Sequence, residues 1–211
     1  SAERKNTPPM PIALPAICAG ICWWWANYFT LVRRMNLPSM VLASAFGLGV
    51  YVSVFTMLAQ GNLPDRGMII LPSLIAMAAM GLWYRRFRLP FSMFVLGVFG
   101  LIAIYAMTAS FDAILGMRAG YGAGFFDLRN SPQFSLATLI FGACAFLGGM
   151  WFDTHDPHRL GRHAATAFWL HLLAAPALVN TVAMTLFNIG GNGGMAATAV
   201  ALALIAMLAL V

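Results

Sequence analysis

The pattern along this chain alternates long apolar runs with short polar loops. Each run has about the length, roughly 20 residues at a rise of about 1.5 Å each, that a helix needs to cross a bilayer. In chain order the runs are Ala13 to Val32, Pro38 to Ala59, Met68 to Tyr84, Pro90 to Ser110, Phe134 to Trp151, Ala164 to Phe187 and Met195 to Val211. We therefore predict an all-α, polytopic transmembrane helical bundle of about seven spans, built from antiparallel helix pairs. Residues 13–211 would form one transmembrane domain behind a polar N-terminal segment, residues 1–12.

The composition indicates that most side chains of this protein are surrounded by lipid instead of water. Hydrophobic residues make up 61%, charged residues only 9%, and the mean hydropathy is +0.82. Soluble domains carry roughly a quarter charged residues, which is the shell that keeps them in water. The net charge of +6 does not indicate a nucleic-acid partner, because the basic residues stand at the ends of the apolar runs. We expect the lipid bilayer as partner, and other membrane-protein subunits if the chain belongs to an assembly.

Lysine and arginine are unevenly shared between the two sides of the predicted bundle. Loops after the first, third and fifth runs hold Arg33, Arg34, Arg85, Arg86, Arg88, Arg159 and Arg162. The other side holds Arg4, Lys5, Arg66, Arg118 and Arg129. Basic loops stay in the cytoplasm, so the N-terminus is expected outside. The last run ends without a polar anchor, and we expect the sequence to be a segment of a longer protein.

Two of the basic loops resemble each other. Residues 33–40 read R-R-M-N-L-P-S-M, and residues 85–93 read R-R-F-R-L-P-F-S-M. If each copy contains two helices, the copies keep the same orientation, which predicts parallel two-helix repeats about an axis along the membrane normal. The alternative is convergence, in which arginine anchors a helix end and proline occupies the first turn of the next helix.

Small and aromatic residues also predict where helices pack. Ala43 with Gly47, and Ala145 with Gly149, stand at the spacing that lets helix backbones approach closely. The run Trp23-Trp24-Trp25 is expected in the aromatic belt at the membrane surface.

The densest polar cluster is the loop after the fifth run. It contains Asp153, His155, Asp156, His158, Arg159, Arg162 and His163. Histidine and carboxylate are zinc ligands, so Asp153, His155, His158 and His163 are weak candidates for a metal site. No standard metal motif is matched, and Asp153 to Pro157 also has the composition of a turn that caps the next helix. We favour a solvated turn and predict no cofactor.

His171 differs because it lies about two turns inside the sixth run. An ionisable group at that depth is costly and is a functional candidate by default. Asn180, Asn27 or a backbone carbonyl on a neighbouring helix is the expected hydrogen-bond partner. Haem bound by two histidines would need a second histidine within a run, and there is none. Pro176 leaves a backbone carbonyl free one turn earlier, which bends the helix or opens a gap in it. We favour a structurally satisfied histidine and an ordinary kink. In the alternative, functional reading, His171, Asn180, Asn27 and Pro176 line a cavity.

Two motifs resemble a group of uncharacterised multi-pass inner-membrane proteins of Gram-negative bacteria. One is W-A-N-Y-F-T at residues 25–30, followed by Arg33-Arg34 and Leu37-Pro38. The more specific one is A-F-W-L-H-L-L-A-A-P at residues 167–176, preceded by the polar turn. The resemblance implies a bacterial inner membrane and a longer parent protein, and it implies no activity.

Function is narrowed mainly by what the sequence lacks. It contains no G-x-S-x-G, H-E-x-x-H or paired intramembrane aspartates. All six acidic residues stand at or beyond the ends of the runs, whereas ion-coupled carriers usually place a carboxylate at depth. The favoured hypothesis is a non-catalytic membrane component: a scaffold, sensor or accessory subunit. The alternative is a transporter or channel for a small solute, with a cavity near His171. A third, an intramembrane metal enzyme using the histidine-rich turn, is the least favoured.

Overall fold

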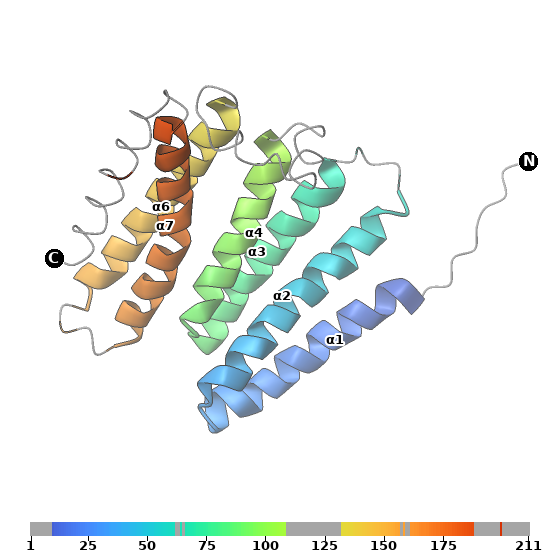
Figure 1. Ribbon diagram of the computed structural model, residues 1–211. Coiled ribbons are helices and arrows are strands. Elements are labelled where there is room, and N and C mark those ends of the chain that lie inside the picture. Colours follow the sequence, from blue (N-terminus) through green and yellow to red (C-terminus); the bar gives the residue numbers. More distant parts are fainter. Residues whose placement is uncertain are drawn as a thin grey trace, which may run out of the picture. The chain divides into compact units, whose positions relative to one another are not determined.

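The computed structural model describes residues 10–61, 64, 66–108, 132–156, 158, 161–187 and 199. Within these residues the chain is helical and contains no strand (Figure 1), which confirms the all-α prediction for this part. The elements are α1 (Met10–Ala26), η1 (Asn27–Val32), α2 (Asn36–Leu58), α3 (Gly67–Phe87), α4 (Phe91–Thr108), α6 (Pro132–Thr154) and α7 (Arg162–Phe187). The run predicted from Met195 to Val211 lies outside the described residues, except for Ala199.

Five of the described helices are long and apolar enough to cross a membrane. They are α2, α3, α4, α6 and α7. Helix α1 has 17 residues and continues into η1, a π-helical segment of six residues. The chain thus has the helices of a membrane-embedded protein, because no soluble fold of this size needs so many uncharged runs.

Contacts along the backbone divide the chain into two compact units, Ser1–Ala103 and Ile104–Val211. Helix α4 runs through the division, so its last residues belong to the second unit. Residues 1–9 of the expected polar segment lie outside the described residues, whereas residues 10–12 already belong to α1. A single transmembrane domain over residues 13–211 stays a prediction.

In the first unit, α1, α2 and α3 lie side by side in chain order, with α2 between the other two (Figure 1). Trp83 of α3 is fully buried and is surrounded by the rings of Trp23, Phe46 and Phe87, at centroid distances of 5.5, 4.7 and 4.6 Å. Offset and edge-on aromatic packing of this kind is favourable beyond the area it buries. The aromatic cluster therefore fixes α1, α2 and α3 at one end of the unit.

This cluster corrects the prediction that Trp23, Trp24 and Trp25 share one role in an interfacial belt. Trp24 and Trp25 are exposed, as that role requires, whereas Trp23 packs against Trp83. Consecutive residues of a helix point about 100° apart, so three adjacent tryptophans cannot all face the membrane.

Small residues bring the helices of the first unit together. Ala43 and Gly47 of α2 are both buried, as their spacing predicts. A Cβ on Gly47 would lie 2.8 Å from the Phe99 ring of α4, so a larger residue there would have to displace that ring. Two residues on, a Cβ on Gly49 would lie 3.1 Å from both the Ala19 Cβ and the Pro15 carbonyl oxygen of α1. Close backbone approach at small residues is the usual way in which membrane helices associate.

The two similar basic turns share one serine hydrogen bond but differ in backbone conformation. Buried Ser39 and Ser92 each donate a hydrogen bond to a carbonyl at the preceding turn, that of Met35 and that of Leu89. The left-handed residue is Arg34 (φ 53°) in the first turn and Arg88 (φ 49°) in the second, which are different places relative to the shared Leu-Pro. Duplication therefore stays a prediction.

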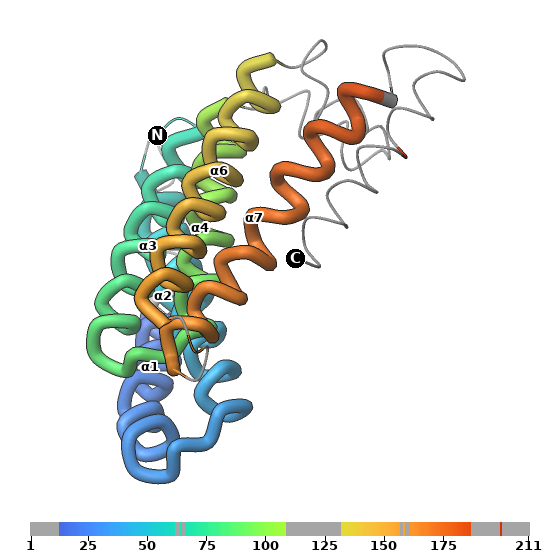
Figure 2. Tube along the Cα trace, turned by 90° about the vertical axis from the view of Figure 1, so that its left-hand side faces the viewer, coloured from blue at the N-terminus to red at the C-terminus, as the bar shows by residue number. Residues whose placement is uncertain are grey.

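In the second unit, α6 and α7 pack against each other next to the polar turn that joins them (Figure 2). The contact is lined by small residues of α6. A Cβ on Gly142 would lie 2.9 Å from the Leu178 side chain and 3.1 Å from that of Ala177. Ala145 and Gly149 are buried as well, as their spacing predicts. Buried Thr138, Thr166 and Thr181 donate to carbonyls of their own helices four residues earlier, so their hydroxyls are satisfied away from water.

Candidate functional site

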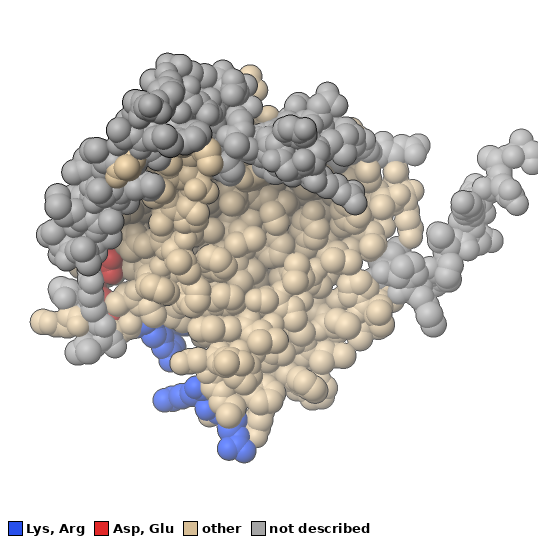
Figure 3. All heavy atoms as spheres, in the orientation of Figure 1, with Lys and Arg blue, Asp and Glu red and all other residues tan. Residues whose placement is uncertain are grey.

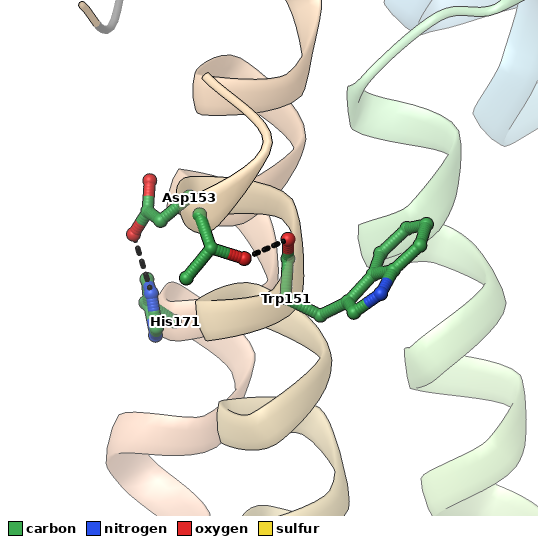
Figure 4. A network of polar contacts seen from close by, with 4 residues as sticks. Trp151, Asp153 and His171 are labelled. Carbon is green, nitrogen blue, oxygen red and sulfur yellow. Dashed lines mark hydrogen bonds and ion pairs between the residues drawn. The ribbon is translucent and has the colours of Figure 1, made fainter. Parts of the chain in front are cut away.

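A histidine and a carboxylate meet between α6 and α7. The Nε2 atom of His171 lies 3.1 Å from the Oδ2 atom of Asp153, and it is the one ion pair found among the described residues. Figure 4 shows the Asp153 carboxylate, from the last turn of α6, pointing toward the ring of His171 in α7. The side chains keep exposed fractions of 30% and 22%. The pair is therefore neither sealed in the protein nor freely placed on its surface.

One face of α6 contacts the imidazole ring of His171. Phe146, Gly149 and Asp153 stand at i, i+3 and i+7, which places them on the same side of a helix. A Cβ at position 149 would come within 2.7 Å of His171 Cε1 and 2.9 Å of both ring nitrogens. The Phe146 ring lies alongside, with its centroid 5.2 Å from that of the imidazole. The ring is thus held over a glycine, beside an aromatic side chain, with its Nε2 atom at a carboxylate.

The sequence-based expectation about the partner of His171 was wrong. Asp153 takes the place expected for Asn180, Asn27 or a backbone carbonyl. Asn180 is exposed on α7, and Pro176 is exposed too, within a helix that continues unbroken to Phe187. Asn27 belongs to the first unit, where its amide donates to the Trp23 carbonyl at 3.0 Å and accepts from Arg86 at 3.3 Å.

Asp153 was misplaced because the apolar run stops at Trp151, whereas α6 continues to Thr154. The extra residues carry Asp153 round to the face that Gly149 already presents to α7. The signal was present in the sequence, since Gly149 and Asp153 stand four residues apart and would share a face of any helix that includes both.

The candidate metal ligands of the polar turn have separate surroundings. His155 Nδ1 lies 2.7 Å from the Trp151 carbonyl oxygen, and its ring packs on that of Trp151. His163 stacks on Phe152, and His158 is exposed. Within the described part of the chain, no three His, Cys, Asp or Glu residues come close enough together to hold a metal ion.

The turn instead shows the capping that its composition predicts. The carboxylate of Asp156 accepts a hydrogen bond at 2.7 Å from the backbone N–H of Gly161, the residue before α7 begins. Thr154 donates to the Trp151 carbonyl at 2.8 Å. These bonds satisfy backbone groups that the end of one helix and the start of the next leave unpaired.

The contact with Asp153 affects the orientation of the His171 ring and the position of its hydrogen. A carboxylate at hydrogen-bond distance orients an imidazole and selects which ring nitrogen carries its hydrogen. Among the described residues, no serine or cysteine hydrogen-bonds to His171.

Comparisons with protein families, with curated proteins and with solved structures found no match to this chain.

Proposed function

We propose that this chain is a non-catalytic component of a bacterial inner membrane: a scaffold, sensor or accessory subunit. It would have about seven spans in antiparallel pairs, an outer N-terminus and cytoplasmic basic loops. The inner-membrane assignment draws its support from the A-F-W-L-H-L-L-A-A-P motif at residues 167–176.

The observation that carries the proposal is how little of each described span is buried. Only 11% of the most apolar stretch of α2 is buried, although α2 has a helix on either side. In α3, α4, α6 and α7 the share is 28% to 33%. Large apolar side chains such as Val41, Leu48 and Met57 stay exposed along α2. Lipid or the helices of another subunit must cover them, and wide apolar faces of this kind suit a component of an assembly.

The proposed orientation is supported by the charges of the first unit. Arg33 and Arg34 follow η1, and Arg85, Arg86 and Arg88 end α3. Arg86 reaches Asn27 of η1, so these two turns belong to the same end of the unit. Among the described basic residues of the first unit, five arginines lie at this end and Arg66 lies at the start of α3, which favours this end as the cytoplasmic one.

A second candidate function has one observation in its favour. Asp153 and His171 form a partly exposed pair that belongs to two adjacent spans. Paired ionisable groups within membrane spans often mark proton or ion pathways. A transporter or channel for a small solute would use this pair as a proton relay or as a polar contact for the solute. This reading requires water to reach His171 from one side of the membrane.

Thiol labelling at position 171 separates the two functions. The native cysteines Cys18, Cys22 and Cys144 are first replaced by alanine, which leaves a background without thiols. His171→Cys is then labelled in membrane vesicles with a membrane-impermeant reagent. The matched controls are Leu172→Cys, an exposed apolar neighbour on α7, and Arg88→Cys, in the exposed turn before α4.

The component proposal expects His171→Cys to react as slowly as Leu172→Cys, because lipid and protein exclude the reagent from both. Reaction as fast as that of Arg88→Cys would show a water-filled path. That result would overturn the component proposal in favour of transport.

A further inference from the structure

The basic end of the first unit is unusually free of counter-charge. It consists of Arg33, Arg34, Arg85, Arg86 and Arg88, and all five are exposed. We name these five residues the arginine end. The described residues of the first unit include no aspartate or glutamate. In Figure 3 the arginine side chains that are visible on this face gather at one end. Their charge is therefore not cancelled by any described carboxylate of their own unit.

Two of the guanidinium groups are held in place by neutral side chains. Arg33 donates through Nε to the Tyr28 hydroxyl at 2.9 Å, and its guanidinium carbon lies 5.7 Å from the centre of the Tyr28 ring. Arg86 donates to Asn27 Oδ1 at 3.3 Å. A guanidinium has five N–H donors, so each arginine keeps most of its donors and all of its charge. The arrangement orients cations for a partner without neutralising them.

Two of the five arginines occupy backbone conformations that are unfavourable for them. Arg34 and Arg88 both adopt left-handed φ values, 53° and 49°. This region favours glycine and is costly for a residue with a long side chain. Helices commonly end with such a residue, and glycine is the usual choice. Arginine at both positions keeps two further positive charges at the turns, against that conformational preference.

Exposed aromatic residues place the arginine end at the level of lipid headgroups. Trp24, Trp25 and Tyr28 have exposed fractions of 75%, 56% and 48%, and they occupy the last turns before Arg33. Tryptophan and tyrosine concentrate at the membrane–water interface, with the ring toward the acyl chains and the polar edge toward water. A phosphate bound by the arginines would therefore carry its glycerol and acyl chains along these rings.

We propose that the arginine end binds the phosphate of an anionic phospholipid headgroup. Guanidinium matches phosphate with two parallel hydrogen bonds, which makes arginine a better phosphate ligand than lysine. Basic clusters next to membrane helices attract anionic lipids, with roughly fivefold in affinity for each basic residue near the surface. The proposal rests on the membrane embedding of the chain and is independent of whether the chain is a component or a transporter.

The test measures lipid binding by the purified full chain in a neutral detergent. Phosphatidylglycerol and phosphatidylcholine are titrated separately in mixed micelles, and inorganic phosphate is titrated in parallel. The main variant, Arg34→Gln with Arg85→Gln, removes two side-chain charges for which the described part of the chain shows no hydrogen bond or ring contact, so its fold should persist. The matched control is Arg66→Gln, an exposed arginine at the start of α3 instead of its end.

We expect phosphatidylglycerol to bind much more tightly than phosphatidylcholine or inorganic phosphate. The double variant should lose on the order of 25-fold in affinity for phosphatidylglycerol, about fivefold for each arginine. Arg66→Gln should bind like the unchanged chain. Arg33→Gln with Arg86→Gln should also lose affinity, and its thermal unfolding will show whether its fold is kept.

Three results would overturn the proposal. Equal affinities for phosphatidylglycerol and phosphatidylcholine would show that the net charge of the headgroup does not contribute to binding. Inorganic phosphate binding as tightly as phosphatidylglycerol would identify a site for a soluble anion. An equal loss of affinity in Arg66→Gln would show that binding depends only on the overall charge of the chain. None of these results changes the labelling expected at position 171, so the two proposals fail separately.

Discussion

At the scale of single residues, the contact between Gly149 and His171 is the tightest constraint on the candidate site. The imidazole lies where a side chain at position 149 would begin. Any residue larger than glycine must move the ring, and the ring cannot move far without losing Asp153. The identity of one residue thus decides whether the ion pair exists.

We predict that Gly149→Ala destabilises the chain by about 1–3 kcal/mol, the usual cost of overfilling a packed contact. Gly148→Ala is the matched control, because a Cβ there would meet only Leu170, at an ordinary 3.7 Å. Thermal or denaturant unfolding of both variants in detergent measures the difference. Equal stabilities would mean that the ring does not rest on Gly149.

A second residue-scale prediction concerns the carboxylate. Asp153→Asn keeps the shape of the side chain and removes its charge. It can still accept a hydrogen bond from the ring, so it should lose little stability. Asp153→Leu has a similar size but leaves His171 Nε2 without its partner, so it should lose about 1 kcal/mol. Unfolding of the two variants in detergent measures the difference, and equal stabilities would contradict the pairing.

At the scale of helices, hydropathy along the sequence predicts the position of each described span within a few residues. The run Pro38 to Ala59 becomes α2 at Asn36–Leu58, and Ala164 to Phe187 becomes α7 at Arg162–Phe187. The helices extend past the runs at several ends, because polar residues can continue a helix once its backbone bonds have started. Hydropathy is a good guide here because lipid forces every span to satisfy its own backbone.

The pairing of side chains between helices could not be predicted in the same way. Both His171 and Asp153 stood out in the sequence, one as a buried ionisable group and the other as part of a turn. Their meeting depends on the rotation of α6 and α7 about their axes. Helices that are apolar all round carry little sequence signal for that rotation. For the same reason the sequence leaves Asn27 as one of several possible partners of His171, whereas in the structure Asn27 contacts Arg86.

The contact between α1 and α2 gives a prediction at this scale. Gly49→Ala places a methyl group 3.1 Å from the Pro15 carbonyl oxygen, and a backbone atom cannot give way cheaply. We expect a loss of about 1–3 kcal/mol. Gly20→Ala is the control on α1, since a Cβ there meets nothing within 4 Å. Alanine favours helix over glycine by about 1 kcal/mol, so this variant should be slightly more stable. Unfolding of the two variants should shift in opposite directions, and a shift of Gly49→Ala toward higher stability would refute close packing of α1 on α2.

At the scale of the whole molecule, the distribution of basic residues should decide how the chain is inserted. In a background without native cysteines, Arg88→Cys and His155→Cys should react with an impermeant thiol reagent in inverted vesicles. Gly61→Cys, beyond the other end of α2, should react only in right-side-out vesicles. The physical reason is the retention of basic loops in the cytoplasm. Labelling of Gly61→Cys and Arg88→Cys from the same side would contradict the predicted topology.

The π-helical segment η1 takes up one extra residue just before the basic turn at Arg33 and Arg34. Its amide at Arg33 bonds to the Tyr28 carbonyl, five residues back, and thereby accommodates one more residue than a regular turn. Deleting a single amino acid between Tyr28 and Arg33 would restore ordinary winding, and the preceding helix would keep nearly its present rotation, because the wide turn already takes up the extra residue. Tyr28 and Arg33 would then stand four residues apart on one helix face, so the ring would still steady the guanidinium in the shortened chain.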